Sequence, residues 1–276
     1  MTKIQSSKLL KEVMKNHFLG LKNTSKKIAW CTSMSPVELL RSFDFEIYFP
    51  ENHGALLGAT RTAGDFIAES KKIGYSDNIC SYLTSDIGSY LKKQTPLQKH
   101  YELNEPPKPD IIIYNTNQCR EVQDWFMYFA KEFNCPVAGI NPPRYIDEIT
   151  DEHINNVSAQ FKAIVPVCEK ISGKKFDVDC FREVIKLSKE STELWKKVLW
   201  MGKYSPAPIN FFDASAYMGP IVVLRGTQTA KNFYTALLSE LEKIRLEQTK
   251  ISAGERCRIY WDGMPIWGKL KTLSEL

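Results

Sequence analysis

Two of the seven cysteines stand where a thiol could bind a metal or take part in redox chemistry. Cys80 and Cys119 each begin a segment with a helical pattern, directly after a polar or extended run. The positive end of a helix dipole lowers the pKa of such a thiol and favours the thiolate, which is the form that binds metals. Cys31 ends a β-rich run at the expected ligand edge, and its position leaves open whether it is an inert or a functional thiol. Spacing alone does not decide between a ligand pair and two unrelated thiols.

A carboxylic acid and an imidazole occur together in residues 51–53, in the expected loop after a second β-rich run. Glu51 could move a proton, and His53 could act as an acid, a base or a ligand. The alternative makes Glu51 a solvated surface acid and His53 a hydrogen-bonded structural residue. Another polar run, which contains Ser33, follows the first β-rich segment.

The other cysteines are expected to be inert. Buried free cysteine is common, and the positions concerned are Cys135, Cys168, Cys180 and Cys257. An odd number of cysteines argues against a disulfide framework, and no C-x-x-C pair indicates a zinc ribbon or a ferredoxin-type site. The sequence also lacks G-x-G-x-x-G and G-x-x-x-x-G-K-[ST], which disfavours nucleotide binding of those kinds.

The elements that must position these residues alternate between β-rich and helical patterns from residue 26 onward, which predicts an α/β fold with a parallel sheet. In such sheets ligands bind beyond the carboxyl ends of the strands, where the polar runs lie. Ser35 is the expected N-cap of the first helix of this region, because Pro36 and Glu38 follow it. The predicted strands are residues 27–31, 45–49, 110–115 and 136–141, and the predicted helices are residues 36–43, 64–72, 80–93 and 119–133.

The pattern becomes helical after residue 143, with long helices predicted at 151–171, 177–199 and 229–246 and one weak strand at 220–225. Residues 256–261 then predict a new strand, followed by a helical run. A single strand and helix cannot bury their apolar faces, so we expect the start of a second α/β domain that is cut short. The alternative is that this strand joins the edge of the first sheet. The predicted parts are an N-terminal helix (1–25), a first α/β domain (26–145), a helical section (146–252) and the start of the second domain (253–276).

The composition of the 276 residues is that of a folded protein, with 43% hydrophobic and 25% charged residues. The net charge of +5 is spread along the chain without a block of Lys and Arg, which disfavours nucleic acid as a partner. No run of 18 apolar residues and no signal-peptide pattern is present, so we predict a cytoplasmic protein without membrane contact.

Four stretches resemble the family of 2-hydroxyacyl-CoA dehydratase and benzoyl-CoA reductase subunits: IAWCTSMSPVELLRSFDF, GYSDNICSYL, NTNQC and RIYWDGMPIWGKL. The resemblance runs from about residue 27 to residue 276. It implies two flavodoxin-like domains joined by helices, with a [4Fe-4S] cluster between them that three cysteines hold. Cys80 and Cys119 match the first two ligands. The third ligand is expected beyond residue 276, which agrees with a shortened second domain.

The same resemblance implies roles for two further residues. Ser33 matches a serine that hydrogen-bonds near an open iron site, and Glu51 matches an active-site carboxylate. It implies one-electron chemistry on an acyl-CoA thioester, with a homologous second subunit and an ATP-hydrolysing iron–sulfur activator as partners. A dry site with a Lewis-acidic iron and a hydroxyl donor suits such chemistry.

The resemblance leaves the reaction open between 2-hydroxyacyl-CoA dehydration and benzoyl-CoA ring reduction, although the runs PENHGALLGATR and WDGMPIW favour the reductase branch. It also leaves open a single or a double cubane cluster. The alternative functions are a non-catalytic electron-transfer or assembly subunit, and a truncated, inactive fragment without a cluster.

Overall fold

The computed structural model describes residues 5–22, 24–144, 146–247, 255 and 257–275. The chain divides into two compact units, one formed by Leu19–Phe181 and the other by Met1–Phe18 together with Arg182–Leu276. Both divisions fall inside long helices. The domain boundaries predicted after residues 25, 145 and 252 stay predictions.

The unit Leu19–Phe181 is built on a four-stranded parallel sheet with the order β2-β1-β3-β4. This is the order of the first four strands in flavodoxin-like sheets. Every strand lies within a predicted segment, so the α/β prediction is confirmed for this unit. Two strands are buried along their whole length, which explains their continuous apolar character. The strands are β1 (Ile28–Cys31), β2 (Glu46–Tyr48), β3 (Ile111–Asn115) and β4 (Val137–Ile140).

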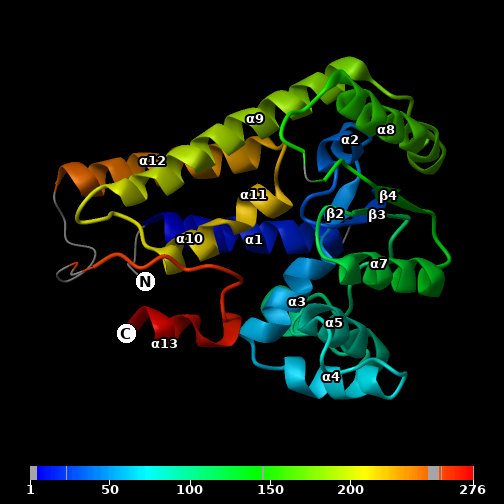
Figure 1. Cartoon of the computed structure of the whole chain (residues 1–276), viewed down its shortest axis with the longest axis horizontal. Helices are drawn as coiled ribbons and strands as arrows, with labels where there is room; N and C mark the ends of the chain where they lie inside the picture. The colour runs from blue at the N-terminus through cyan, green and yellow to red at the C-terminus, as the bar shows by residue number, and fades with distance from the viewer. Residues whose placement is uncertain (1–4, 23, 145, 248–254, 256, 276) are drawn as a thin grey trace. The chain divides into compact units, whose positions relative to one another are not determined.

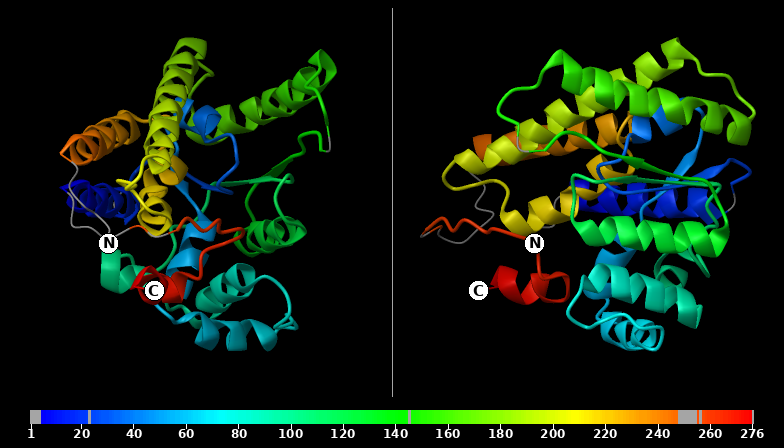
Figure 2. Two further views of the ribbon diagram at one scale, coloured as in Figure 1. Left: turned by 60° about the vertical axis from the view of Figure 1, so that its left-hand side comes forward. Right: turned by 45° about the vertical axis from the view of Figure 1, so that its right-hand side comes forward.

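Helices cover both faces of this sheet (Figure 1). On one face α2 (Val37–Ser42) contacts β2, and α8 (Asp151–Ser172) contacts β4. On the other face α7 (Arg120–Phe133) packs against β3 and β4, and the views in Figure 2 agree. α7 packs through an apolar stripe with helical spacing, formed by Val122, Trp125, Phe126 and Phe129.

Three further helices, α3 (Pro50–Ala59), α4 (Ala63–Lys71) and α5 (Ser81–Lys92), pack closely on one another, and α6 (Leu97–Tyr101) follows them. Glycine makes the approach of α4 and α5 possible, because a Cβ at Gly88 would lie 1.8 Å from the carbonyl oxygen of Phe66. The expected loop at residues 51–53 is wrong, since these residues form the first turn of α3. Pro50 stands among the first helical positions, where its missing N–H is not needed.

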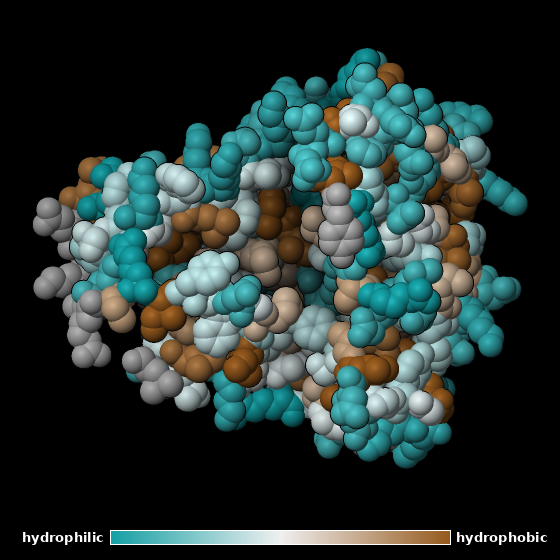
Figure 3. All heavy atoms as spheres, in the orientation of Figure 1, coloured by the Kyte–Doolittle hydropathy of each residue, from teal (hydrophilic) through white to brown (hydrophobic). Residues whose placement is uncertain are grey.

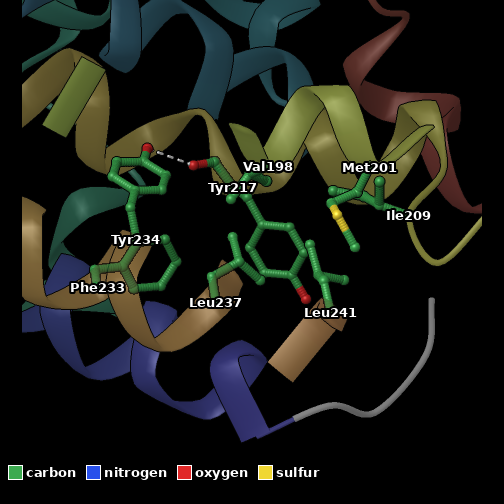
Figure 4. Packing of buried hydrophobic residues seen from close by; sticks show 8 residues of the cluster. All are labelled: Val198, Met201, Ile209, Tyr217, Phe233, Tyr234, Leu237 and Leu241. Atoms are coloured by element: carbon green, nitrogen blue, oxygen red, sulfur yellow. Dashed lines mark hydrogen bonds between the residues drawn. The ribbon is translucent and has the colours of Figure 1, made fainter. Parts of the chain in front are cut away.

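The second unit contains helices and connecting segments but no strand in its described part. A cluster of eight buried side chains forms its core, and α12, α10 and the end of α9 contribute to it (Figure 4). The Tyr234 hydroxyl donates to the Tyr217 carbonyl oxygen at 2.8 Å and accepts the Ile221 N–H at 2.8 Å, which fixes α11 and the end of α10 on α12. The elements are α1 (Gln5–Lys22), α9 (Val178–Trp200), η1 (Met201–Lys203), α10 (Phe211–Tyr217), α11 (Gly219–Val223), α12 (Gln228–Leu246), η2 (Trp267–Lys269) and α13 (Leu270–Glu275).

The long helices expose polar faces, as their sequence pattern predicts. In Figure 3 the upper edge of the drawn surface, where α9 runs, is mainly hydrophilic. The exposed residues of α9 include Lys186, Lys189 and Glu193. Within the described residues, no helix combines the length and the apolar character needed to cross a bilayer.

Three local predictions are wrong. Pro36, not Ser35, is the N-cap of α2, because the Ser35 hydroxyl donates instead to the Ile113 carbonyl oxygen at 2.9 Å. The weak strand at 220–225 is largely the helix α11. Residues 257–261 form no strand, and the Tyr260 side chain is 89% exposed. A strand needs partners for its backbone, and the described residues provide none here. Residue 256 lies outside the described residues.

Candidate active site

The carboxyl ends of β1 and β3 form the topological switch point of the sheet. From β1 the chain proceeds to β2 on one side, whereas β3 lies on the other side. The loops that leave β1 and β3 therefore run apart, and ligands bind in the crevice that such divergence creates. The predicted polar runs at residues 31–33 and 115–119 both lie here.

Hydrogen bonds join the first residues of these two loops, before the loops diverge. The side-chain amide of Asn115 donates to the Met34 carbonyl oxygen at 3.0 Å, and its backbone N–H donates to Thr32 Oγ1 at 3.2 Å. Asn115 Oδ1 accepts the Asn117 N–H at 2.9 Å, which turns the chain toward α7. The last residue of β3 thus fixes the loop that follows β1 as well as its own.

The structure brings Ser33 and Glu51 together. The Ser33 backbone N–H donates to Glu51 Oε2, and the Gln118 side-chain amide donates to Glu51 Oε1 at 2.7 Å. The same Gln118 nitrogen lies 3.5 Å from Ser33 Oγ. Both carboxylate oxygens are therefore engaged by fixed donors, which orients the acid at the crevice. The roles predicted for Ser33 and Glu51 stay predictions.

Gln118 is the residue of this cluster to which the sequence assigned no role. Its Oε1 is buried and has no hydrogen-bond partner among the described residues, whereas its Nε2 contacts Glu51 and Ser33. A buried acceptor without a donor is unfavourable, so a donor from a bound molecule fits here. Its place directly before Cys119, in a polar run after a strand, was the available signal.

Cys80 and Cys119 are the N-cap residues of α5 and α7, as predicted, and neither helix start has a side-chain cap. The expected lowering of the thiol pKa is wrong for Cys119. Desolvation of its sulfur raises its pKa although the residue is exposed as a whole, and the negative charge of Cys80 raises it further. A hydrogen bond from the Val122 backbone opposes this rise without cancelling it. The charge of Cys80 is thus one of the influences on the Cys119 thiol.

His53 does not face the crevice. It is 2% exposed, with Nδ1 bonded to Asp86 Oδ1 and Nε2 bonded to Thr95 Oγ1 at 2.7 Å. Of the two alternatives for this residue, the structure favours the hydrogen-bonded structural histidine.

None of the hydrogen bonds that join Ser33, Glu51 and Gln118 involves one of the remaining cysteines. Cys168 is buried in α8, where desolvation raises its pKa to about 12, and burial also raises the pKa of Cys135. The Cys180 thiol donates to the Ser42 carbonyl oxygen at 3.7 Å, and Cys257 is exposed. Cys31 is fully buried at the end of β1.

The two thiols at helix N-termini are suitable as part of the ligand set of an iron–sulfur cluster, since such clusters are bound by thiolates. The described residues bring no group of three His, Cys, Asp or Glu side chains together that could hold a metal ion. Cys80 and Cys119 would therefore supply two ligands of a site that needs more. The third ligand stays a prediction.

Comparisons with known proteins match nearly the whole chain. The family model for the 2-hydroxyglutaryl-CoA dehydratase D-component matches residues 32–276. The (R)-2-hydroxyisocaproyl-CoA dehydratase alpha subunit of Clostridioides difficile is 33% identical over 276 residues, covering 97% of this chain and 65% of the relative. The (R)-phenyllactyl-CoA dehydratase alpha subunit of Clostridium sporogenes is 29% identical, covering 93% of this chain and 63% of the relative.

A reductase subunit is also similar. One of the benzoyl-CoA reductase subunits of Thauera aromatica is 30% identical over 250 residues, which cover 87% of this chain and 57% of that protein. The chain thus spans about two thirds or less of the length of these three relatives. The match to the family model extends from the polar run after β1 to the last residue, and the chain belongs to the 2-hydroxyglutaryl-CoA dehydratase D-component family.

Proposed function

We propose that this chain contributes the Ser33–Glu51–Gln118 cluster to the active site of an enzyme that dehydrates 2-hydroxyacyl-CoA thioesters. The observation that supports it most is the fixed carboxylate of Glu51, held by Gln118 and by the Ser33 backbone at the carboxyl ends of the strands. The dehydratase subunits among the relatives support the substrate class.

The donors and acceptors of the cluster match the groups of such a substrate. The Ser33 hydroxyl can donate to the thioester carbonyl oxygen, where negative charge develops during the reaction. The 2-hydroxyl group can donate to Gln118 Oε1, the buried acceptor that has no partner among the described residues. A site that pairs its buried polar atoms with a substrate hydroxyl selects strongly for that hydroxyl.

Glu51 is suited to move the proton. Dehydration removes the 2-hydroxyl group as water and a proton from the neighbouring carbon, so an oriented carboxylate can accept a proton and return it to the leaving hydroxyl. Orientation by two donors keeps one lone pair of each oxygen free for this task. Overall the reaction gains and loses no electrons.

Cys80 and Cys119 would bind a [4Fe-4S] cluster beside this group, and their N-cap positions and coupling support that assignment. When bound, such a cluster supplies one-electron chemistry and a Lewis-acidic iron. We further propose a homologous second subunit, since the relatives are themselves named as subunits, and an ATP-hydrolysing iron–sulfur activator as partners.

Ring reduction of benzoyl-CoA is the second candidate, and the similarity to the benzoyl-CoA reductase subunit of Thauera aromatica favours it. A benzoyl group carries no hydroxyl donor, so it would leave Gln118 Oε1 without a partner. This unpaired acceptor favours dehydration over ring reduction. An electron-transfer or assembly role would require neither an oriented Glu51 nor an acceptor at Gln118.

Product analysis separates these functions. The anaerobically reconstituted protein, with its second subunit and an activator, is incubated with 2-hydroxyisocaproyl-CoA and, separately, with benzoyl-CoA. We expect the enoyl-CoA product from the first substrate, and its loss in Glu51→Gln. Ring reduction without dehydration would establish the second candidate instead, and redox cycling without turnover of either thioester would leave an electron-transfer subunit.

A further inference from the structure

A buried polar cluster joins the three helices whose N-terminal ends form the candidate active site. The Asp86 carboxylate on α5 is 2% exposed, and each of its oxygens has a different partner. Oδ1 bonds His53 Nδ1 on α3, and Oδ2 accepts the Trp125 Nε1–H on α7 at 2.8 Å. Thr95 Oγ1 satisfies the other nitrogen of His53 at 2.7 Å.

Two members of this polar cluster lie at equal sequence distances from the two cysteine caps of the candidate site. Asp86 lies six residues after Cys80 on α5, and Trp125 lies six residues after Cys119 on α7. Six residues correspond to about 9 Å along a helix axis. The bond between Asp86 and Trp125 therefore joins α5 and α7 at the same distance along each helix from its cysteine cap. It thereby fixes the position of one cap relative to the other along the helix axes.

The third helix is fixed by the same carboxylate. His53 lies two residues after Glu51 on α3. A shift of α3 along its axis would move Glu51 away from Gln118 and would also break the bond between His53 and Asp86. One buried side chain thus connects the acid and both thiols of the candidate site.

A contribution to core stability does not explain why a buried acid, Asp86, occupies this position. Apolar side chains of similar volume often replace a buried ionic group without loss of stability, whereas directional hydrogen bonds fix one relative placement of the helices.

We propose that Asp86 is a positioning residue that fixes Cys80, Cys119 and Glu51 relative to one another, through its hydrogen bonds to Trp125 and His53. This role rests on the proposed function, because Cys80 and Cys119 are metal ligands only in that function. Groups that hydrogen-bond directly to metal ligands change metal affinity by about 10- to 100-fold when they are removed, and we expect an effect within this range from a group that places two ligands through their helices.

Cadmium binding to the metal-free full chain tests the placement of the thiols without any catalysis. Cd²⁺ is titrated anaerobically, and the absorbance of cadmium–thiolate bonds is followed in wild type, Trp125→Phe and Trp30→Phe. Phenylalanine keeps an aromatic ring and removes the indole N–H. Trp30 is a matched control, since it is 1% exposed in the same unit and also packs on aromatic rings of α7. Its Nε1–H, however, donates at 2.8 Å to the Pro107 carbonyl oxygen and not to Asp86.

We expect Trp125→Phe to weaken Cd²⁺ binding by about 10- to 100-fold and Trp30→Phe to leave it within about twofold of wild type. Equal affinities in wild type and both variants, with folding verified by circular dichroism, would overturn the proposal for Asp86. Wild type that binds Cd²⁺ no better than Cys80→Ala would instead contradict the ligand pair of the proposed function. Should Trp125→Phe fail to fold, Asp86→Asn, which keeps the size of the side chain, decides by the same measurement.

Discussion

The side-chain amide of Gln118 donates to the carboxylate of Glu51 at 2.7 Å, across 67 residues of sequence. The two residues come from different strand ends, since Glu51 follows β2 and Gln118 follows β3. Because the Ser33 backbone engages the other carboxylate oxygen, the acid has one fixed orientation at the switch point of the sheet. Gln118 is thus the link between the loop after β3 and the acid of the proposed reaction.

Replacing Gln118 by alanine removes this link. We expect Gln118→Ala to lower kcat/KM for a 2-hydroxyacyl-CoA by about 100-fold, because an incorrectly oriented acid loses the geometry of proton transfer. Gln160→Ala is the matched control, since Gln160 on α8 donates through Nε2 to the Asn141 carbonyl oxygen at 3.0 Å and makes no hydrogen bond to Glu51. Steady-state kinetics of the assembled enzyme decide the point. Equal losses in both variants would mean that Gln118 has no special role.

The ligand role of the two N-cap thiols predicts which cysteines an iron–sulfur cluster needs. We expect Cys80→Ala and Cys119→Ala each to lose most of the iron and sulfide that wild type retains after anaerobic reconstitution, because a cluster without one thiolate is labile. Cys168→Ala should retain them, since Cys168 is buried in α8 and is not part of the site. Retention of iron by both cap variants would contradict the ligand assignment.

The coupling between the thiols can be measured directly. The charge of Cys80 is one of the causes that raise the pKa of Cys119, so Cys80→Ala should lower that pKa. A lower pKa gives more thiolate at a given pH. The midpoint of the pH dependence of Cys119 alkylation by iodoacetamide, followed by peptide mass spectrometry, should therefore move to lower pH. Cys180→Ala should leave the midpoint unchanged, and a shift in neither variant would place the thiols far apart.

The sequence predicted the sheet well because the four strands are short apolar runs between turn residues. The Ile28–Cys31 and Ile111–Asn115 strands are buried along their whole length, and this produces continuous apolar runs that are too short for a typical helix. The cysteine caps were also predictable, since a helical pattern begins directly after Cys80 and Cys119.

The errors have physical causes of a different kind. The polar residues at 51–53 indicated a loop, but the helix α3 begins at Pro50. Burial of His53 against Asp86 stabilises this helix. The bond between Asp86 and Trp125 joins residues 39 apart and leaves no local pattern. Gln118 was visible only as one polar residue in a run, because its function depends on contact with another strand end.

A buried acid in the helical unit predicts how stability depends on pH. Asp213 on α10 is 4% exposed, its Oδ1 has no hydrogen-bond partner among the described residues, and burial raises its pKa above the ordinary value of 3.8. The folded state therefore binds this proton more tightly than the unfolded state does. The destabilisation by the ionised acid is complete above the raised pKa and disappears as the pH falls below the unfolded value.

We accordingly expect Asp213→Asn to raise the urea midpoint of unfolding at neutral pH, and the gain to shrink steadily as the pH approaches 3.8. The amide keeps the shape of the side chain and is never ionised. Asp262→Asn, at an exposed position of the same unit, should change the midpoint little at any pH. A gain of equal size at all pH values would show that charge is not the cause.

The contact of α4 with α5 gives a stability prediction that also bears on the site. A Cβ at Gly88 would lie 1.8 Å from the Phe66 carbonyl oxygen, so Gly88→Ala must push α5 away from α4. We expect a loss of about 1–3 kcal/mol in the free energy of unfolding, as for other overpacked cores.

Gly64→Ala is the control, because nothing lies within 4 Å of its Cβ and alanine favours the helix by up to about 1 kcal/mol. Since α5 also carries Cys80 and Asp86, Gly88→Ala should weaken Cd²⁺ binding, whereas Gly64→Ala should not. A Gly88→Ala chain as stable as wild type and with unchanged Cd²⁺ affinity would show that the placement of α5 on α4 does not set the position of the Cys80 cap.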